Sequence, residues 1–402
     1  MNRLRQLTSR YPRQFWFLLG GILISASGGS MVWPFLTIYM RQRLDVSLTT
    51  VGLLLALNSA ARLVTTFVAG PVVDRFGRKG VMVISLLASA MVYAAMGQVS
   101  SPPAWVLLMI ANGGLAPLYR IGSDAMVADL LSPDMRAGAY ALLRMGNNVG
   151  IAIGPAAGGF LAATSYGWTF AAATVSSLIF ALITLFLVSE TLPLREDKHT
   201  QVSPLATYNT LLHDKPFLIF WLVSALAVLP SSILMVLLPV YAKEQYGVVE
   251  SQYGFIMATN AAMVVIFQYA ITNATRRYRS LPVLTTGAFF YAIGVGSVAL
   301  GQGFWAFWLS MVILTVGEMI LVPTGTTLTA NLAPADQRGR YMGVYSLTWS
   351  LGVGVGPAVG GFLSDQIAPV AIWYGGLTFG LAATLGFLLL STRLEEPSGE
   401  PA

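Results

Sequence analysis

Apolar runs of 20 or more residues recur along the whole 402-residue chain, and they constrain its fold more than any other feature. Each run is about long enough to cross the ~30 Å hydrocarbon layer of a bilayer as a helix. Only 10% of the residues are charged, whereas soluble proteins carry about 25%. The sequence therefore predicts an all-α polytopic membrane protein.

Twelve spans are predicted, which makes this a chain of twelve transmembrane helices. Arginines near the N-terminus precede the first run, but no small-residue cleavage site follows it, so the run is taken as a span rather than a signal peptide. The predicted spans are residues 15–40, 48–73, 80–100, 104–131, 137–163, 167–190, 216–243, 251–275, 281–301, 304–332, 339–366 and 370–392.

The distribution of Lys and Arg predicts the orientation of these spans. The N-terminus, the even-numbered loops and the C-terminus hold 17 of the 23 basic residues, and the odd-numbered loops hold Arg41, Arg43 and Lys243. Because positive charge is in excess on the cytoplasmic side, both termini are expected in the cytoplasm, with the chain in the inner membrane. The net charge of +6 reflects this asymmetry, so no nucleic-acid partner is expected.

Residue counts also exclude several kinds of site. The chain has no cysteine and only two histidines, His199 and His213, in one loop, so neither thiol chemistry nor a metal cluster is expected. No nucleophile–base pair, phosphate loop or nucleotide-binding domain is evident, which argues against an enzyme and against ATP as the energy source. No cofactor is expected, and a proton gradient is the expected driving force.

The chain contains an internal repeat with an offset of 202 residues. GIAIGPAAGGFL at 150–161 returns as GVGVGPAVGGFL at 352–363. Each half holds six spans in one order and orientation, which predicts two six-helix bundles with a substrate site between them. The predicted bundles are residues 1–190 and 216–402, joined by a polar cytoplasmic linker at 191–215.

Several motifs resemble those of the major facilitator superfamily, in particular its twelve-helix drug:proton antiporters. GPVVDRFGRKG at 70–80 looks like the signature between the second and third helices of that superfamily, and GIAIGPAAGG resembles the glycine–proline motif of the antiporters. GEMILVPTGTTLTANLAPADQRGRYMGV at 317–344 looks like part of bacterial multidrug members. GGSMVWPF and Arg120 resemble two further signatures. The resemblance implies the major facilitator fold and alternating access by a monomer.

The first motif predicts a conformational latch. In the resembled family its aspartate caps a helix of the opposite half, and its second arginine pairs with an acid of the fourth helix. Carried over, Asp74 faces the helix that starts near Arg338, and Arg78 pairs with Asp129. Such contacts stabilise one conformation and break in the other. The predicted latch residues are Gly70, Asp74, Arg75, Gly77, Arg78 and Asp129.

The second motif predicts close helix packing. Gly150, Gly154 and Gly158 recur at four-residue spacing, with Pro155 and Gly159 beside them. Small residues on one face let two helix backbones approach closely, and proline adds a bend. The resemblance implies that this face packs against the span at 251–275 and seals one side of the cavity.

Five charged residues fall deep inside predicted spans, away from the span ends: Arg62, Arg120, Asp124, Arg144 and Glu318. Each costs at least ~2.5–3.5 kcal/mol at the centre of a membrane helix, so each is expected to face protein or a water-filled cavity. Asp124 and Arg144 lie about equally far from the turn between their helices, which predicts an ion pair, either static or exchanging its proton. Arg120 lies one turn from Asp124 on the same face, and the resemblance implies an influence on proton transfer.

Glu318 is the predicted coupling site. It lies about midway along its span, without a basic residue of that helix nearby. A carboxyl group poised between burial and a cavity cation can take up a proton on one side of a membrane and release it on the other. The resembled multidrug transporters carry a glutamate in this context, tied to proton coupling and cation recognition. The alternative is a neutral acid that makes one hydrogen bond between helices. The predicted coupling residues are Glu318, Asp124, Arg120 and Arg144.

Aromatic and amide side chains are the candidates for the substrate surface, although single aromatics in a membrane protein commonly serve packing. Arg62 has no general counterpart in the resembled family. It could orient a carboxylate, bind an anionic substrate or pair with Glu318. The candidate substrate-binding residues are Trp33, Tyr39, Asn58, Arg62, Asn147, Asn260, Gln268 and Trp349.

The sequence therefore favours proton-coupled efflux of lipophilic, cationic small molecules. A rival is a proton-coupled carrier or exchanger of an organic anion or another small solute, because three arginines outnumber two acids inside the spans. A second rival is a receptor on the same scaffold, against which the intact loop signature and Glu318 weigh. The expected partners are the substrate, protons and the lipid bilayer.

Overall fold

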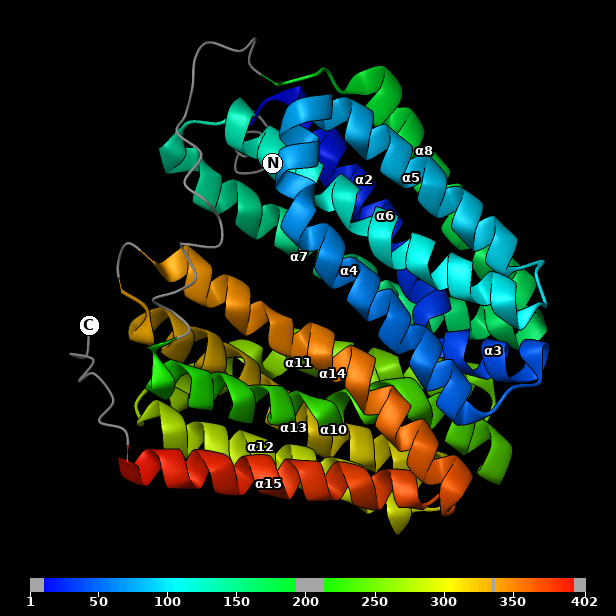
Figure 1. Cartoon of the computed structure of the whole chain (residues 1–402), viewed down its shortest axis with the longest axis vertical. Coiled ribbons are helices and arrows are strands. Elements are labelled where there is room, and N and C mark those ends of the chain that lie inside the picture. The colour runs from blue at the N-terminus through cyan, green and yellow to red at the C-terminus, as the bar shows by residue number, and fades with distance from the viewer. Residues whose placement is uncertain (1–10, 193–212, 335–336, 394–402) are drawn as a thin grey trace. The chain divides into compact units, whose positions relative to one another are not determined.

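The computed structural model describes residues 11–192, 213–334 and 337–393, and most of these residues are helical (Figure 1). These ranges contain no strand, so the predicted all-α fold class is confirmed. The predicted linker falls largely on residues 193–212, outside the described ranges. The helices of the first half are α2 (Arg13–Val32), α3 (Leu36–Leu44), α4 (Leu48–Phe76), α5 (Arg78–Met96), α6 (Pro102–Leu130), α7 (Pro133–Thr164) and α8 (Tyr166–Leu187). Those of the second half are α10 (Lys215–Tyr246), α11 (Glu250–Thr275), α12 (Ser280–Gly296), α13 (Gly303–Leu332), α14 (Arg338–Gln366) and α15 (Ala371–Arg393).

Most of these helices are long and apolar enough to cross a membrane. Eleven such segments occur in the described residues, and Arg13–Leu44 counts as one of them although it contains the 3-10 turn Trp33–Phe35. Proline has no amide hydrogen to donate, so Pro34 accounts for that turn. α7 is not among the eleven, because Asn147, Asn148 and its glycines lower its hydropathy, but at 32 residues it is long enough to span.

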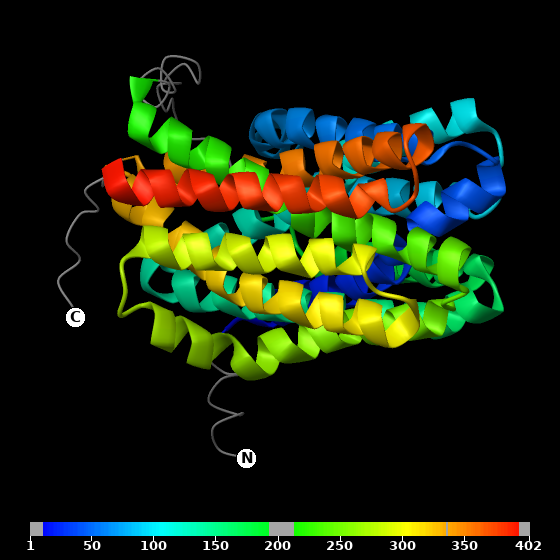
Figure 2. The ribbon, with the colours of Figure 1, turned by 90° about the horizontal axis from the view of Figure 1, so that it is seen from below.

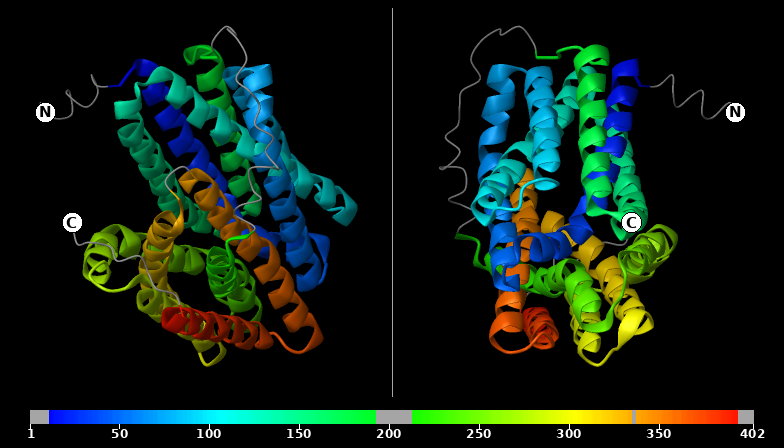
Figure 3. Two further views of the ribbon diagram at one scale, coloured as in Figure 1. Left: turned by 60° about the vertical axis from the view of Figure 1, so that its left-hand side comes forward. Right: turned by 90° about the vertical axis from the view of Figure 1, so that its right-hand side faces the viewer.

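The helices form two compact units. Unit 1 comprises Met1–Asp45, Leu57–Glu196 and Val249–Ala258, and unit 2 comprises Val46–Ala56, Asp197–Val248 and Thr259–Ala402. The units follow the two sequence halves, except that the first turns of α4 belong to unit 2 and the first turns of α11 to unit 1. In unit 1, α2 packs against both α7 and α8 (Figure 3). In unit 2, α12 packs against both α13 and α15 (Figure 2).

The predicted glycine motif of α7 is divided between two neighbours: Gly150, Gly154 and Gly158 pack against α2, whereas the predicted contact with α11 is made by Pro155 and Gly159. A Cβ atom at Gly150 would lie 2.9 Å from the Leu23 carbonyl oxygen, and one at Gly158 would lie 2.5 Å from that of Met31. The Ser30 hydroxyl also donates to the Gly150 carbonyl oxygen at 3.1 Å. Four-residue spacing keeps Gly150, Gly154 and Gly158 on a single face, and that face is occupied by α2.

Pro155 and Gly159 form a second face of α7, which approaches the start of α11. A Cβ atom at Gly254 would lie 2.8 Å from the Pro155 carbonyl oxygen and 3.2 Å from the Gly159 Cα atom. Gly159 follows Gly158 by about 100° around the helix, so adjacent glycines serve two different neighbours.

Unit 2 repeats these contacts at the 202-residue offset. Ser232 donates to the Gly352 carbonyl oxygen at 2.6 Å, as Ser30 does to Gly150. A Cβ atom at Gly52 in the first turns of α4 would lie 2.5 Å from the Ala358 Cα atom of α14. α14 therefore packs against α10 on one face and against the start of α4 on another.

Polar contacts also fix the first turns of α4 and α11. In unit 2, Asp365 accepts hydrogen bonds from the Thr49 amide at 2.7 Å and the Thr49 hydroxyl at 2.6 Å. A carboxylate is favourable there because the N-terminus of a helix carries partial positive charge. In unit 1, the Tyr166 hydroxyl donates to the Glu250 carboxylate at the start of α11.

A Gly52→Ala substitution is expected to lower the free energy of unfolding by about 1–3 kcal/mol, since the added methyl group meets the backbone of α14. Gly343→Ala is the matched control on α14, because a Cβ atom at Gly343 meets nothing within 4 Å. Alanine is about 0.5–1 kcal/mol more favourable than glycine inside a helix, so the control should be neutral or stabilising. Denaturation in detergent measures both, and equal effects would contradict the packing described.

Candidate functional site

The loop between α4 and α5 holds the motif predicted to form a latch. α4 ends at Phe76, and Gly77 adopts φ +89°, a backbone conformation that other residues rarely adopt. A Cβ atom at Gly77 would also lie 2.7 Å from a carboxylate oxygen of Glu190. Glycine is therefore needed at this position both for the turn and for the close approach of Glu190.

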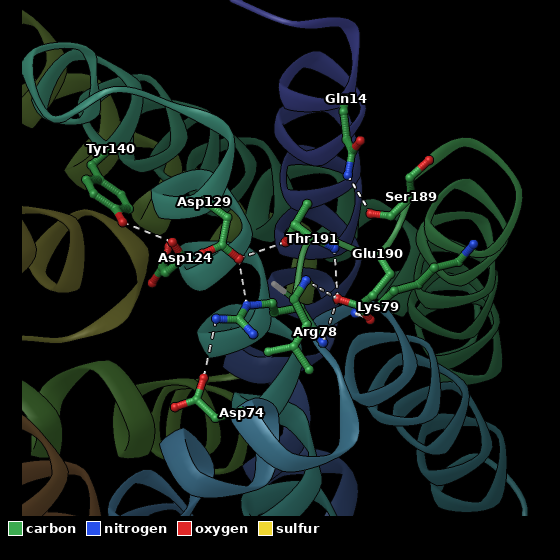
Figure 4. Close-up of polar contacts among 11 residues, drawn as sticks. Gln14, Asp74, Arg78, Lys79, Asp124, Asp129, Tyr140, Ser189, Glu190 and Thr191 are labelled. Carbon is green, nitrogen blue, oxygen red and sulfur yellow. Dashed lines mark hydrogen bonds and ion pairs between the residues drawn. The ribbon is translucent and has the colours of Figure 1, made fainter. Parts of the chain in front are cut away.

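Arg78 is the centre of this cluster (Figure 4). Although it is only 8% exposed, it lies between two carboxylates. Its Nε atom lies 2.7 Å from Oδ2 of Asp129, and its Nη2 atom lies 3.4 Å from Oδ1 of Asp74. The pair predicted between Arg78 and Asp129 is thus present in unit 1. The contact predicted between Asp74 and the helix near Arg338 would join the two units and stays a prediction.

Glu190, which directly follows α8, completes the cluster and was missed by the sequence analysis. Its carboxylate accepts hydrogen bonds from the amides of Arg78 at 3.1 Å and Lys79 at 3.0 Å, at the start of α5. It also accepts from the amides of Thr191 and Leu192, both at 2.9 Å. The Thr191 hydroxyl donates to Asp129 at 2.9 Å. Its position in the sequence could have revealed Glu190. The end of the sixth span lies on the same side of the membrane as the loop after the second span, which holds the latch motif.

The hydrogen bonds of Glu190 change its titration. Partial burial by itself raises the pKa of Glu190, but four backbone amides outweigh this effect and hold the pKa below its usual value. The carboxylate is therefore charged under ordinary conditions and stabilises the exposed amides at the start of α5.

The ion pair predicted between Asp124 and Arg144 is wrong. Asp124 pairs with Arg120, one turn earlier on α6, at 4.0 Å, and no ion pair joins Arg144 to any residue in the described ranges. The residue of α7 that reaches Asp124 is Tyr140, whose hydroxyl donates to the Asp124 carbonyl oxygen at 2.9 Å. α6 ends at Leu130 and α7 begins at Pro133, four residues earlier than the predicted start at residue 137, so Arg144 lies about one turn deeper than Asp124, near the depth of Arg120.

Arg120 reaches across to α7 instead. Its Nη1 atom donates to Oδ1 of Asn147 at 3.1 Å. Unit 1 thus brings together Arg120, Asp124 and Asn147, three of the residues predicted to serve coupling or substrate binding.

Unit 2 contains a second polar cluster, centred on Asn260 and Glu318. The Asn260 side-chain amide on α11 donates to Oε2 of Glu318 at 2.8 Å and to the Thr315 hydroxyl at 2.9 Å, both on α13. Glu318 is partly buried, and the fully buried Tyr291 of α12 packs against the preceding residue, since a Cβ atom at Gly317 would lie 2.9 Å from the Tyr291 ring. No Lys, Arg or His of the described ranges forms an ion pair with Glu318.

Asn58 is the counterpart of Asn260 at the 202-residue offset. Its side-chain amide donates to the Met109 carbonyl oxygen at 3.0 Å and to Oδ1 of Asn112 at 3.1 Å, both on α6. Since Asn58 is 1% exposed, its donors hold α4 against α6 rather than facing a cavity. The same helix pair is therefore joined by an asparagine in each half.

The other predicted substrate residues fall into different surroundings. Tyr39 is buried among the rings of Trp105, Tyr166 and Phe170, and its hydroxyl donates to the Gly97 carbonyl oxygen at 3.2 Å, so it serves packing in unit 1. Gln268 donates from α11 to the Met319 carbonyl oxygen at 2.9 Å, next to Glu318. Trp33 and Trp349 are partly buried, and Arg62 is exposed.

Comparison with known proteins assigns this fold to a family. The sequence pattern of the Major Facilitator Superfamily matches residues 18–247 and 220–402, which together cover nearly the whole chain. The chain belongs to the Major Facilitator Superfamily. It is a multi-pass membrane transporter.

Relatives and solved structures agree with this assignment. The chain is 25% identical to the "Na(+), Li(+), K(+)/H(+) antiporter" of Planococcus maritimus, over 90% of this chain and 91% of that protein. It is 26% identical to "Multidrug resistance protein 2" of Bacillus subtilis, over 92% and 94% of the two chains. The crystal structure of the nucleoside transporter NupG is similar with a TM-score of 0.81 at 16% identity, covering 96% of this chain and 100% of that one, which shows the shared fold.

The lowered pKa of Glu190 predicts a pH dependence of stability. The stabilising contribution should be complete above the unfolded pKa of about 4.3 and be lost as the pH falls through the lower folded value. Glu190→Gln should therefore show a weaker decrease in melting temperature between neutral pH and about pH 3. The control is Asp45→Asn, because Asp45 is exposed and its backbone, with φ 51°, suits asparagine. If Glu190→Gln and wild type showed the same dependence of melting temperature on pH, the hydrogen bonds of Glu190 to the start of α5 would contribute nothing to stability.

Proposed function

We propose that this transporter exports lipophilic, cationic small molecules in exchange for protons by alternating access. The observation that carries the proposal is the Glu318 carboxylate, which lies within a membrane helix and is bound by the Asn260 amide instead of a cation. A charge in this environment is costly, so the group favours any ligand that neutralises it.

A single carboxylate explains how two fluxes can be coupled. A proton and a cationic substrate each neutralise Glu318, and one carboxylate cannot bind both at full strength. Binding of one therefore weakens binding of the other, and by linkage the effect is reciprocal. Alternate occupancy of one site from opposite sides of the membrane is the requirement for antiport.

The Asn260 amide gives the site a fixed orientation without a fixed counter-charge. As a neutral donor, it positions Oε2 of Glu318 at 2.8 Å while leaving the charge of the carboxylate uncompensated. An arginine in place of Asn260 would hold the carboxylate permanently ionised. Neutral donors from Asn260 are therefore compatible with a group that must bind and release a proton.

Further parts of the proposal follow from the superfamily fold. The two predicted bundles, residues 1–190 and 216–402, would be the bodies that move, with Asp74, Arg78 and Asp129 as the latch. The excess of Lys and Arg in the even-numbered loops supports cytoplasmic termini. In the proposal, the chain lies in the inner membrane and works as a monomer. The names of the relatives, a cation/proton antiporter and a multidrug resistance protein, support this choice.

Replacement of Glu318 by Gln is the decisive test of the proposal. In proteoliposomes with an imposed pH gradient, wild-type protein should drive efflux of rhodamine 123, a lipophilic cation. Glu318→Gln should reduce gradient-driven efflux by about tenfold or more, because glutamine cannot take up the proton; downhill exchange of the dye should persist. Glu244→Gln, at the exposed end of α10, is the matched control and should behave as wild type.

If Glu318→Gln still coupled dye efflux to the proton gradient, the role of Glu318 would be limited to a hydrogen bond between α11 and α13. Coupling would then have to depend on Asp124 with Arg120, and exchange of an organic anion would become the stronger reading.

A further inference from the structure

Thr315 belongs to the polar cluster of Glu318, although the proposed exchange gives it no role. It lies one turn before Glu318 on α13, and residues three apart on a helix share a face. Thr315 is fully buried, and its hydroxyl donates to the Met311 carbonyl oxygen at 2.7 Å. A hydroxyl has only one hydrogen to donate, so toward Asn260 of α11 it offers acceptor lone pairs alone.

This arrangement determines which end of the Asn260 side chain faces Glu318. A carboxamide has two ends of nearly equal shape, a carbonyl oxygen that accepts and an NH2 group that donates. The NH2 nitrogen lies 2.9 Å from the Thr315 hydroxyl oxygen and 2.8 Å from Oε2 of Glu318, so each of its two hydrogens has one acceptor. If the amide turned over, its carbonyl oxygen would meet a Thr315 oxygen whose hydrogen is already donated to Met311. Thr315 therefore keeps the NH2 group toward Glu318.

An amide held in this orientation acts differently on the two forms of Glu318. Its bond to the carboxylate is charge-assisted, and such bonds are stronger than those to a neutral acid. The amide carbonyl oxygen, which could accept the O–H of protonated Glu318, is turned away. Because a hydrogen bond to the charged form favours that form, the orientation of Asn260 assists release of the proton.

The other groups around α13 do not titrate beside Glu318. α12 and α14 bring two phenols toward α13: the Tyr291 ring lies against Gly317, and the Tyr345 hydroxyl lies against Gly325. Phenols stay neutral up to about pH 10. The part of α11 in unit 2, residues 259–275, has no charged residue, and its Tyr269 is 84% exposed. The remaining titratable groups of α10 and α14 with charge at neutral pH, or near it, lie at or next to the ends of those helices: His213, Asp214, Lys215, Lys243, Glu244, Arg338, Arg340 and Asp365.

We propose that Thr315 is a positioning residue for the exchange of protons and cations. By accepting a hydrogen bond from Asn260, it holds the amide as a donor to Glu318 and so sets the pH at which Glu318 gives up its proton to a cation. The inference rests on the proposed function for the role of the cation. The orientation of the amide depends only on contacts within unit 2.

Thr315→Val tests this role, because valine keeps the shape of threonine but removes the hydroxyl. Asn260 is then free to turn its carbonyl oxygen toward protonated Glu318. Binding of tetraphenylphosphonium, a cation without a titratable group, is measured between about pH 5 and about pH 9 with the full-length protein in nanodiscs of phosphatidylcholine. The pH at which affinity reaches half its rise should be about one unit higher in Thr315→Val than in wild type. At pH values above both midpoints, the two affinities should agree within about twofold.

Three further variants serve as controls. Thr315→Ser keeps the hydroxyl and should restore the wild-type midpoint. Thr329→Val is the matched control, since Thr329 is also fully buried on α13 and donates to the Gly325 carbonyl oxygen at 2.8 Å; it should leave the midpoint unchanged. In protein that carries Asn260→Leu, the addition of Thr315→Val should cause no further shift, because Thr315 acts through Asn260.

Three results would overturn the role of Thr315. The first is an unshifted midpoint in Thr315→Val. The second is weaker binding of tetraphenylphosphonium at every pH, which a merely structural residue would give. The third is a full additional shift when Thr315→Val is combined with Asn260→Leu.

Infrared titration of the Glu318 carboxyl group separates this inference from the proposed function. The C=O band of protonated Glu318 is identified by its loss in Glu318→Gln, and its decrease with rising pH is followed without any cation. If this titration shifted in Thr315→Val while wild-type binding of tetraphenylphosphonium did not depend on pH, cation exchange would be overturned and the role of Thr315 kept. If binding depended on pH but the infrared titration were equal in wild type and Thr315→Val, the positioning role would be overturned instead.

Discussion

Close contact between helix backbones at glycine is the interaction on which the rest of this structure depends. In unit 1, α7 touches α2 through Gly150 and Gly158 and touches the start of α11 through Gly159. α14 repeats both contacts in unit 2. Because lipid offers no hydrophobic drive for helices to associate, such contacts must come from dispersion and from hydrogen bonds such as that of Ser30 to Gly150. Side chains larger than hydrogen would separate the helices and displace every polar group that they carry.

The role of each charged residue on this scaffold depends on the groups that surround it. Arg78 is buried but compensated by Asp74 and Asp129, as a structural ion cluster requires. Among the described residues of unit 2, Glu318 has no basic partner, and its carboxylate accepts a hydrogen bond from the neutral Asn260 amide. Uncompensated charge in a membrane protein favours a ligand, which is why the proposal gives Glu318 to protons and cations.

Much of the fold was predictable from the sequence, because the bilayer imposes length and hydropathy on every span and the 202-residue offset shows the repeat. The pair of Arg78 with Asp129 was also predictable, since Arg78 begins α5 at the same depth at which Asp129 lies near the end of α6. The direction in which side chains point was harder to predict from the sequence. Asp124 was assigned to Arg144 because the start of α7 was predicted at residue 137 instead of Pro133, an error of four residues or about one helical turn.

Contacts between segments distant in the sequence were the least predictable. Glu190 caps α5 across more than a hundred residues, and the glycines of α7 serve two neighbours that spacing alone could not distinguish. Tyr39 resembled a ligand contact by type, yet its depth in a ring cluster is a property of tertiary packing. A single sequence shows the periodic pattern of each helix well, but it does not show which neighbouring helix each face contacts.

The internal repeat has a consequence for evolution of this chain. A duplicated scaffold has retained its hydrogen bond from serine to glycine in both copies, whereas the charged positions have diverged. Val264 stands where the first half has Arg62, and Ala116 stands where the second half has Glu318. Each half therefore records that the same helix pair folds without the charge found in the other. The frame shared by the two halves therefore does not depend on either charge.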